Sequence, residues 1–551
     1  MGGCAGRRWQ ATVRASWRAV REFGRFRRDA SGTTAVLFAL SLSAMMFIVA
    51  MSLDYGRAEL ERMHMQRVLD AATLAASHHL GADNPDEKGR AAAEAFYRIN
   101  SQHVTQTQIE TLEMDLQKGE VRATAGGNVM TSLLNAFNIR RIEIGAGSKV
   151  VRGDGTMEIA LVLDNSGSMG GQPIADLITA ATSLTNTVFA GVTDADRVKV
   201  AVVPFAGSVN VGSEYRTAAW MDRDGLSPMH HQDQLVAEKR TRFQLYEDLG
   251  KTWGGCVEVR PSPHDVADTP ASLANPLTLF VPMFAPDEPD TLNAAGQNYP
   301  NNYLSDFGGA CPAPTQVCTN WNSRRNRCDA YGPEALSPIV AQGRTCKYNS
   351  ASYTGPGPNT GCTTRPIEPL SGIKTDVVSA ISQLTANGMT NIGEGVMWGW
   401  RTLSPAEPFT EGRRYDDPKN KKIMVVMTDG ENTYNTYGNQ NKTGYLAYGY
   451  GLPLPAPLGM GHPGRLGTTY TQSAIVSQMN TKLTAACANA KAEGITIYTI
   501  AFRLESSPTT LALLRACASS TDKAYLASDG ASLIQIFQVI GREISQIRVA
   551  G

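Results

Sequence analysis

Residues 158–168 read EIALVLDNSGS, and this stretch decides the fold. Its first part is almost entirely apolar, as in a strand that is buried on both faces. Asp164, Ser166 and Ser168 follow at positions i, i+2 and i+4, on the turn that ends this strand. In open α/β sheets, ligands bind beyond the carboxyl ends of the strands. The stretch therefore predicts a buried strand that ends in a cluster of oxygen side chains.

Apolar strands and helical segments alternate around this strand. The segments that we predict are helix 173–189, strand 198–206, helix 372–386, helix 390–403, strand 421–430, helix 479–494, strand 495–502 and helix 532–548. Short apolar strands that alternate with helices indicate a mainly parallel sheet covered on both faces. The sequence thus predicts a doubly wound α/β fold.

Two later segments add oxygen side chains to the first cluster. Thr390 stands just before a predicted helix, and Asp429 stands at the end of another apolar strand. Hydroxyls and carboxylates suit Mg²⁺, Mn²⁺ or Ca²⁺ rather than zinc or copper. We therefore predict a divalent-cation site, most simply for Mg²⁺, built by Asp164, Ser166, Ser168, Thr390 and Asp429. The alternative is that these are ordinary turn residues, because Asp, Ser and Gly are common in turns.

The pattern DxSxS, then Thr, then Asp at a strand end resembles the metal-ion-dependent adhesion site (MIDAS) of von Willebrand factor A (vWA) domains. The resemblance implies a Rossmann-like domain over residues 156–548. It also implies that Ser166, Ser168 and Thr390 touch the metal directly, whereas Asp164 and Asp429 act largely through bound water. One coordination position would stay open for a partner's carboxylate. Because no nucleophile–base pair is evident, we expect binding rather than catalysis, and therefore not an enzyme.

Two long segments interrupt the α/β pattern. Residues 206–371 are rich in Pro, Asn, Gly and Tyr and hold six cysteines, and residues 431–471 are rich in Tyr, Gly and Pro. Loops of this length inside a compact domain are either functional or partly disordered. Our hypothesis is that both insertions shape specificity around the metal. The alternative is a disordered or self-packed cover.

The N-terminus predicts a membrane anchor. Residues 30–53 contain no charged residue, and 24 helical residues span about 36 Å, enough for a hydrocarbon core of about 30 Å. Residues 1–32 carry eight arginines against two acidic residues. The positive-inside rule then makes 1–29 a basic cytoplasmic tail and 30–54 a single transmembrane helix, with the rest of the chain outside the cytoplasm. The alternative, a cleaved signal peptide, normally has a shorter apolar region.

Residues 55–150 predict a small membrane-proximal α+β region, because two helical stretches precede segments rich in Thr, Val and Ile. Of the nine cysteines, Cys4 lies on the predicted cytoplasmic side. The other eight are an even number on the oxidising side, which predicts disulfides. The absence of a CxxC pair disfavours zinc, but the counting leaves the pairing open.

The stretch RRDASGTTAVLFALSL at 27–42, followed by LDAATLAAS at 69–77, is similar to the start of TadE/TadG-like proteins of tight-adherence (Flp) pilus machinery. TadG-like members join such an anchor to an exported A domain with a long insertion. The resemblance implies a single-pass protein of a bacterial inner membrane, with its bulk in the periplasm and pilus or envelope proteins as partners. It also implies a disulfide between Cys487 and Cys517.

Composition excludes other classes of function. Lys+Arg and Asp+Glu both number 51, and a nucleic-acid-binding face would usually make the chain basic. Gly393-Glu394-Gly395 lacks the GKS/T of a phosphate loop, so we expect no nucleotide. His230-His231 lacks the spacing of a metalloprotease helix, so we expect a loop role. The expected function is metal-dependent binding in Flp pilus assembly or anchoring. The alternatives are a surface adhesin and an accessory subunit of an AAA+ motor.

Overall fold

A computed structural model of the chain describes residues 33–79, 84–101, 107–115, 120–151, 155–349, 356–451, 464–469 and 471–550. The chain divides into two compact units, residues 1–152 and 153–551, which we describe separately. The predicted basic tail at 1–29 and Cys4 lie outside the described residues.

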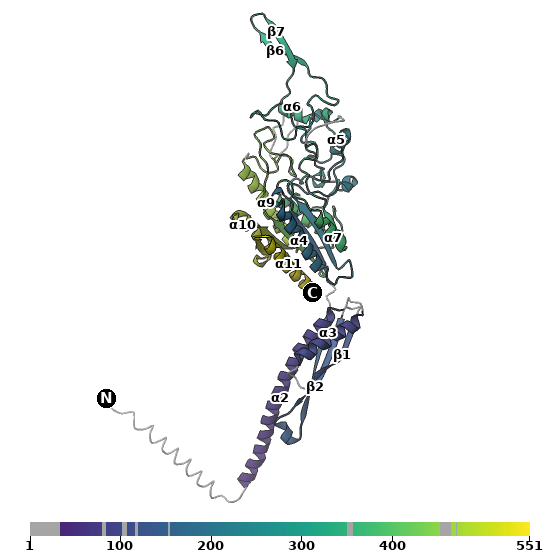
Figure 1. The fold of residues 1–551 in the computed structure, drawn as a ribbon, viewed down its shortest axis with the longest axis vertical. Helices are drawn as coiled ribbons and strands as arrows, with labels where there is room; N and C mark the ends of the chain where they lie inside the picture. The colour runs from purple at the N-terminus through teal and green to yellow at the C-terminus, as the bar shows by residue number, and fades with distance from the viewer. Residues whose placement is uncertain are drawn as a thin grey trace, which may run out of the picture. The chain divides into compact units, whose positions relative to one another are not determined.

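The described residues of the first unit form two α-helices and a three-stranded antiparallel sheet (Figure 1). Its elements are α2 (Thr33–Ser77), α3 (Pro85–Asn100), β1 (Thr107–Asp115), β2 (Glu120–Met130) and β3 (Arg141–Val151), and the strand order is β1-β2-β3. Leu69 and Ala72 of α2 share a buried cluster with Val121 and Ala123 of β2. The apolar run and the amphipathic stretch after it form one continuous helix, α2, which is long and apolar enough to cross a membrane.

The second unit is built on a six-stranded sheet in the order β11-β10-β9-β4-β5-β8. The strands are β4 (Thr156–Asp164), β5 (Val198–Phe205), β8 (Glu368–Ser371), β9 (Asn420–Thr428), β10 (Thr496–Phe502) and β11 (Ala524–Ala527). All neighbours run parallel except β5 and β8. The prediction of a mixed α/β unit with a mainly parallel sheet is therefore confirmed. The edge strands β8 and β11 were not predicted, because four residues each are too few to form a recognisable pattern.

Helices cover both faces of this sheet. The helices are α4 (Gln172–Val188), α7 (Lys374–Ser382), α8 (Ile392–Leu403), α9 (Gln472–Ala492), α10 (Pro508–Cys517) and α11 (Gly530–Ala550). Side chains alternate across a strand, so Ile159 and Leu161 of β4 join the cluster with α4, α7 and α11. Ala160 and Val162 join the cluster with α8 and α9 on the other face. The sheet is thus the middle of three layers.

The insertion at 206–371 has little regular structure, as predicted, but many of its described residues pack against the sheet, whereas the hairpin at 316–333 is exposed. It contains α5 (Arg242–Asp248), α6 (Pro338–Gly343), β6 (Gln316–Asn322) and β7 (Arg327–Pro333), and its last four residues are β8, which belongs to the central sheet. Large side chains such as Trp220, Tyr246 and Phe280 are buried in the cluster that also covers the sheet. The β6–β7 hairpin projects away from the rest of the unit (Figure 1).

Four disulfides join the eight cysteines of the second unit. The pairs are Cys256–Cys362, Cys311–Cys346, Cys318–Cys328 and Cys487–Cys517. The prediction of disulfides is confirmed, and so is the pair Cys487–Cys517 that the resemblance implied. That disulfide joins α9 to α10, and both cysteines are buried.

Candidate metal site

The predicted ligands converge where the strand order changes direction. After β4 the chain continues to β5 on one side of it and later returns to β9 on the other. Such a switch point, beyond the carboxyl ends of the strands, is where open α/β sheets bind ligands. Leu163 of β4 pairs with Met427 of β9, so Asp164 lies opposite Thr428. Asp429 follows directly, at the same edge of the sheet.

Hydrogen bonds link four of the five predicted ligands, Asp164, Ser166, Ser168 and Asp429, into one cluster. The Ser166 and Ser168 hydroxyls lie 3.0 Å apart, and Ser168 Oγ donates to Asp429 Oδ1 at 2.6 Å. Asp164 accepts the backbone N–H of Ser166 at 2.8 Å and the Thr428 hydroxyl at 2.6 Å. The turn of the DxSxS stretch therefore folds back so that its side chains face β9.

Thr390 completes the set. It lies in the segment before α8, and its backbone N–H donates to Thr433 Oγ1 at 2.8 Å. Gly430 lies between the Thr390 and Ser168 hydroxyls. A Cβ atom built on this glycine would be 3.5 Å from Thr390 Oγ1 and 3.8 Å from Ser168 Oγ, so both hydroxyls are next to the same point. The structure thus brings all five sequence-predicted side chains to one edge of the sheet.

Burial decides the electrostatics of the two carboxyl groups. Asp164 is fully buried, and this burial raises its pKa to about 6; the charge of Asp429 acts in the same direction, against hydrogen bonds from Thr428 and Ser166. Burial also raises the pKa of Asp429, which the Ser168 hydroxyl and the charge of Arg503 oppose. Two carboxylates held together in a poorly solvated place favour a positive charge between them.

The chemistry of this donor set fits a hard divalent cation. It offers three hydroxyl and two carboxylate groups, and all of their ligand atoms are oxygen. Ser168 is exposed, whereas Ser166 and Thr390 are almost fully buried, so the cluster opens to the surface on the side of Ser168. Among the described residues there is no group of three or more His, Cys, Asp or Glu side chains that could hold a metal.

Sequence reasoning missed the threonines that position these ligands. Thr428 orients Asp164 through its hydroxyl, and Thr433 holds the backbone of Thr390. Thr428 could have been found, because it immediately precedes Asp429 on a strand predicted to lie beside Asp164. Thr433 could not, because its contact depends on the path of the loop after β9.

The two insertions meet beside this cluster. Leu446 of the second insertion lies against Gly207 of the first, where a Cβ would be 2.9 Å from Leu446 Cδ2. Val259 and Tyr448 belong to the same buried cluster, against which Met389 packs. Because Met389 directly precedes Thr390, both insertions lie against the segment that carries a predicted ligand.

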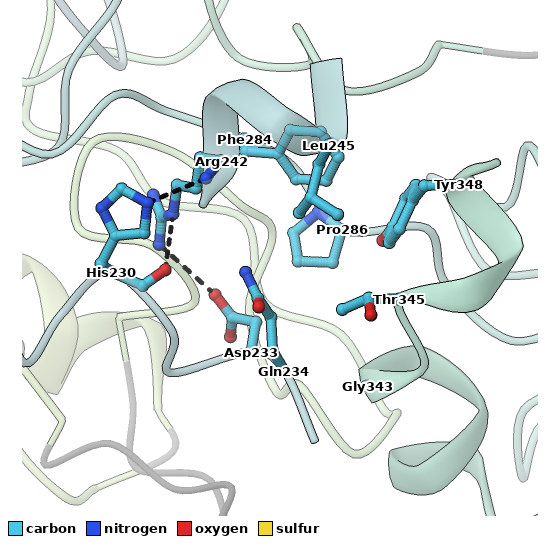
Figure 2. A pocket seen from close by; sticks show the side chains of 10 residues that line it. All are labelled: His230, Asp233, Gln234, Arg242, Leu245, Phe284, Pro286, Gly343, Thr345 and Tyr348. Atoms are coloured by element: carbon cyan, nitrogen blue, oxygen red, sulfur yellow. Dashed lines mark hydrogen bonds and ion pairs between the residues drawn. The ribbon is translucent and has the colours of Figure 1, made fainter. Parts of the chain in front are cut away.

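A second candidate site lies inside the first insertion (Figure 2). The pocket is lined by His230, Asp233, Gln234, Arg242, Leu245, Phe284, Pro286, Gly343, Thr345 and Tyr348. Its volume of about 10 Å³ is about the space that one water molecule needs. His230 accepts the backbone N–H of Arg242 at Nε2 and bonds Asp222 through Nδ1 at 2.9 Å, so both ring nitrogens are used. His230 is therefore structural, as predicted.

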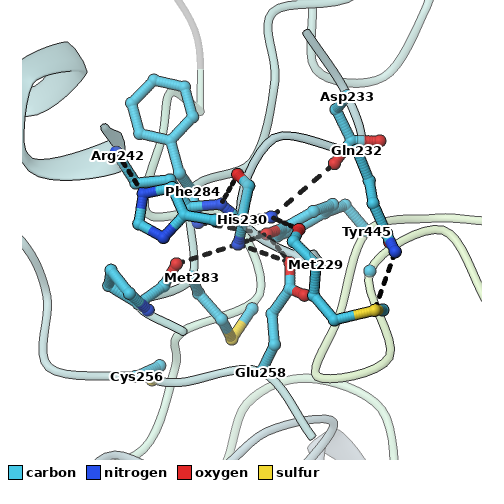
Figure 3. A network of polar contacts seen from close by, with 12 residues as sticks. Met229, His230, Gln232, Asp233, Arg242, Cys256, Glu258, Met283, Phe284 and Tyr445 are labelled. Carbon is cyan, nitrogen blue, oxygen red and sulfur yellow. Dashed lines mark hydrogen bonds and ion pairs between the residues drawn. The ribbon is translucent and has the colours of Figure 1, made fainter. Parts of the chain in front are cut away.

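The polar groups around this pocket tie the two insertions together (Figure 3). The Arg242 guanidinium donates to Glu258 Oε1 at 2.6 Å and to Tyr445 Oη at 3.1 Å. Arg465 forms an ion pair with the other oxygen of Glu258. Arg242 and Glu258 belong to the first insertion, and Tyr445 and Arg465 to the second. The arrangement is a buried structural network, which leaves the sheet edge as the better candidate site.

Comparison with known proteins gives one family match, and it lies at the N-terminus. The model of the family described as putative Flp pilus-assembly TadE/G-like matches residues 32–92. No curated protein sequence matches the chain.

Similar solved structures include three pilus proteins. The pilus adhesin SpaC of Lactobacillus rhamnosus GG is 12% identical, with 80% of this chain and 35% of SpaC covered and a TM-score of 0.31. The vWF domain of the type V pili tip protein Mfa5 of Porphyromonas gingivalis is 10% identical, with 71% of this chain and 96% of that domain covered and a TM-score of 0.31. The PilB minor pilin of Streptococcus sanguinis is 12% identical, with 80% of this chain and 78% of PilB covered and a TM-score of 0.30. The chain spans about a third of SpaC. Likenesses this remote carry no argument about function.

The family match covers most of the two stretches in which the sequence showed the resemblance, namely residues 32–42 of the first and all of the second, at 69–77, which lies within α2. This resemblance is therefore confirmed: residues 32–92 match the model of the TadE/G-like Flp pilus-assembly family.

Proposed function

We propose that the second unit is a vWA domain that binds pilus or envelope proteins through a divalent cation, in the assembly or anchoring of a Flp pilus. The observation that carries the proposal is the convergence of five oxygen side chains, from three separate segments, at the switch point of the sheet. Ser166, Ser168 and Thr390 would touch the cation, and Asp164 and Asp429 would balance its charge.

The bound cation would supply an electrostatic grip on a carboxylate of the partner. The chain's own residues prepare that grip. Thr428 and the Ser166 backbone orient Asp164, and Ser168 presents its hydroxyl at the surface. Exposed Arg503, whose charge acts on Asp429, adds a second attraction for an acidic partner. We propose no chemical reaction at this site: its role is non-enzymatic binding.

The pilus role rests on the TadE/G-like segment at 32–92 and on α2. We propose that α2 is a single-pass anchor in a bacterial inner membrane, with the N-terminus in the cytoplasm and both units in the periplasm. The four disulfides of the second unit are consistent with an oxidising compartment.

The first test is a thermal melt of the full chain in detergent with Mg²⁺, Mn²⁺, Ca²⁺ or chelator. A cation that binds only the native state stabilises it by about 2.7 kcal/mol at a hundredfold excess over its dissociation constant. We expect this gain in the wild type and its loss in Ser168→Ala and Thr390→Ala. Ser382→Ala, at an exposed position of α7, is the matched control and should keep the gain. A wild type that no cation stabilises would contradict the metal site.

The second test concerns the pilus. A deletion strain complemented with the wild type should assemble Flp pili, and one complemented with Thr390→Ala should assemble fewer at equal protein level. Counting pili by electron microscopy measures the effect. Normal piliation by the deletion strain itself would contradict the pilus role but not the metal site.

A further inference from the structure

The turn between β2 and β3 carries exposed apolar side chains. Residues 131–140 read TSLLNAFNIR, and Met130 directly precedes them. The exposed fractions are 60% for Met130, 45% for Leu133, 40% for Phe137 and 40% for Ile139. Surface turns are usually polar, and a group of exposed apolar side chains marks a surface that contacts something else.

This turn is fastened to α2 at the end of its apolar run. The Asp54 carboxylate accepts the backbone N–H groups of Ser132, Leu133 and Leu134 at 2.7–3.2 Å. Phe137 packs edge-on against Phe47, with ring centroids 5.0 Å apart. The turn therefore lies along the last two helical turns of the uncharged stretch.

These contacts fix the depth of the turn relative to the predicted span. Asp54 is the first charged residue after the run at 30–53, and Phe47 precedes it by seven residues, which is about 10 Å along a helix. Apolar faces of interfacial segments are buried about 5–10 Å into the boundary between headgroups and acyl chains. In a membrane crossed by this run, Phe137, beside Phe47, would lie at that depth.

Polar and aromatic groups at the same level suit the headgroup region. Tyr55 is 58% exposed just beyond Asp54, as is typical of aromatic belts at membrane surfaces. Arg140 and Arg141 close the turn and are exposed, so they can reach lipid phosphates. The three N–H groups on Asp54 satisfy a carboxylate that would otherwise be costly beside hydrocarbon.

We propose that residues 130–139 form a second membrane contact, a turn that inserts Leu133, Phe137 and their neighbours into the leaflet from which α2 emerges. The partner is lipid, and the inference rests on the proposed membrane span of α2. Together, the helix and the turn hold the first unit to the membrane at two points.

The test measures where single side chains lie in a reconstituted full chain. A Cys4→Ser background removes the one cysteine outside the four disulfides. Single cysteines are then introduced by Leu133→Cys and Phe137→Cys. Met46→Cys, exposed on the apolar half of α2, is the span control. Lys88→Cys is the water control. The neighbouring Gly89 lies against Ala76 of α2, which is 22 residues beyond Asp54 on that helix and therefore far from the uncharged run.

Each cysteine carries a nitroxide in vesicles of phosphatidylethanolamine and phosphatidylglycerol. Collisions with oxygen, which concentrates in the bilayer, are compared with collisions with a water-soluble nickel complex. We expect a severalfold higher oxygen-to-nickel ratio at positions 133 and 137 than at 88, approaching that at 46. A water-like ratio at 133 and 137 with a lipid-like ratio at 46 would overturn the inference and leave the span intact.

Two other results would also overturn it. Low collision rates with both reagents at 133 and 137 would mean that protein, such as a second copy of the chain, covers the turn. A water-like ratio at 46 would overturn the membrane span itself, and the inference with it.

Discussion

At the scale of single residues, the two carboxyl groups at the sheet edge differ in what surrounds them. Asp164 is fully buried and accepts hydrogen bonds from Ser166 and Thr428. Asp429 is half-buried and feels the positive charge of Arg503. Asp164 is thus a fixed part of the fold, whereas Asp429 can be changed with less disturbance.

This difference makes Asp429→Asn an informative variant. The change removes one of two like charges, so in chelator we expect a melting temperature equal to or above that of the wild type. In saturating Mg²⁺ we expect the wild type to gain stability and the variant to gain much less. Asp224→Asn, at an exposed position, should behave like the wild type. An undiminished gain in the variant would remove Asp429 from the site.

Glu258 predicts a specific dependence on pH. Burial raises the pKa of this carboxyl, but the charges of Arg242 and Arg465 outweigh it and hold the pKa at about 2, below its ordinary value of 4.5. A carboxyl group whose pKa is lower in the folded than in the unfolded state stabilises the fold at pH values above its unfolded-state pKa. This stabilisation is lost as the pH falls toward 2. The shift of this pKa corresponds to roughly 3 kcal/mol of unfolding free energy.

We therefore expect Glu258→Gln to destabilise the protein strongly at pH 7, because the guanidinium groups of Arg242 and Arg465 lose the carboxylate that they share. The difference in unfolding free energy from the wild type should shrink between about pH 5 and pH 2. Denaturant unfolding at several pH values measures it. Glu247→Gln, at an exposed position of α5, is the control. A difference that stays constant with pH would show that the network does not depress this pKa.

At the scale of elements, close packing places α8 on the sheet. Gly399 of α8 faces Val162 of β4, where a Cβ would lie only 2.4 Å from Val162 Cγ2. Gly395 likewise lies against Phe205 of β5. The small residues allow α8 to approach the strands, and Thr390 stands directly before this helix. The position of one predicted ligand therefore depends on glycines that carry no ligand atom.

Two disulfides of similar chemistry should differ in what they stabilise. Cys487–Cys517 joins α9 and α10 within the buried core and closes 30 residues, for which chain entropy predicts about 3–4 kcal/mol. Cys318–Cys328 joins β6 and β7, a two-stranded hairpin with exposed side chains. An isolated hairpin is marginally stable by itself, so this disulfide should hold only the hairpin.

We expect the double variant Cys487→Ala with Cys517→Ala to lower the melting temperature clearly. Cys318→Ala with Cys328→Ala should leave it nearly unchanged and make the hairpin sensitive to protease. Calorimetry and limited proteolysis measure the two effects. Equal losses of melting temperature in both variants would show that the hairpin is part of the cooperative core.

At the scale of the whole molecule, the two units carry different features. The TadE/G-like match and the apolar half of α2 belong to the first unit. The four disulfides and the five predicted ligands belong to the second. Perturbations of the metal site or the disulfides should therefore act on one unit and spare the other.

Hydrogen exchange of the full chain in detergent tests this separation. Mg²⁺ should slow exchange around β4, α8 and β9 and leave β1–β3 unchanged. Reduction of the disulfides should speed exchange in residues 155–545 and again leave β1–β3 unchanged. Faster exchange in β1–β3 on reduction would mean that the stability of the two units is coupled.

Much of this architecture follows from local patterns. The apolar strands at 158–164 and 421–428 and the helices after them are visible because burial in a sheet or along a helix face imposes its own periodicity. The run at 30–53 is visible because 24 residues in a row carry no charge. The edge strands β8 and β11 escaped prediction because four residues show no period.

The sequence by itself determined the α/β order, the long apolar helix near the N-terminus and the set of five oxygen side chains, since each depends on residue types at short spacing. Only the tertiary structure decided which cysteines pair in the insertion, that Arg242 meets Glu258 and Arg465, and that Phe137 lies against Phe47. The physical reason is that these contacts join residues from separate segments, and their free energy depends on how the chain packs between them.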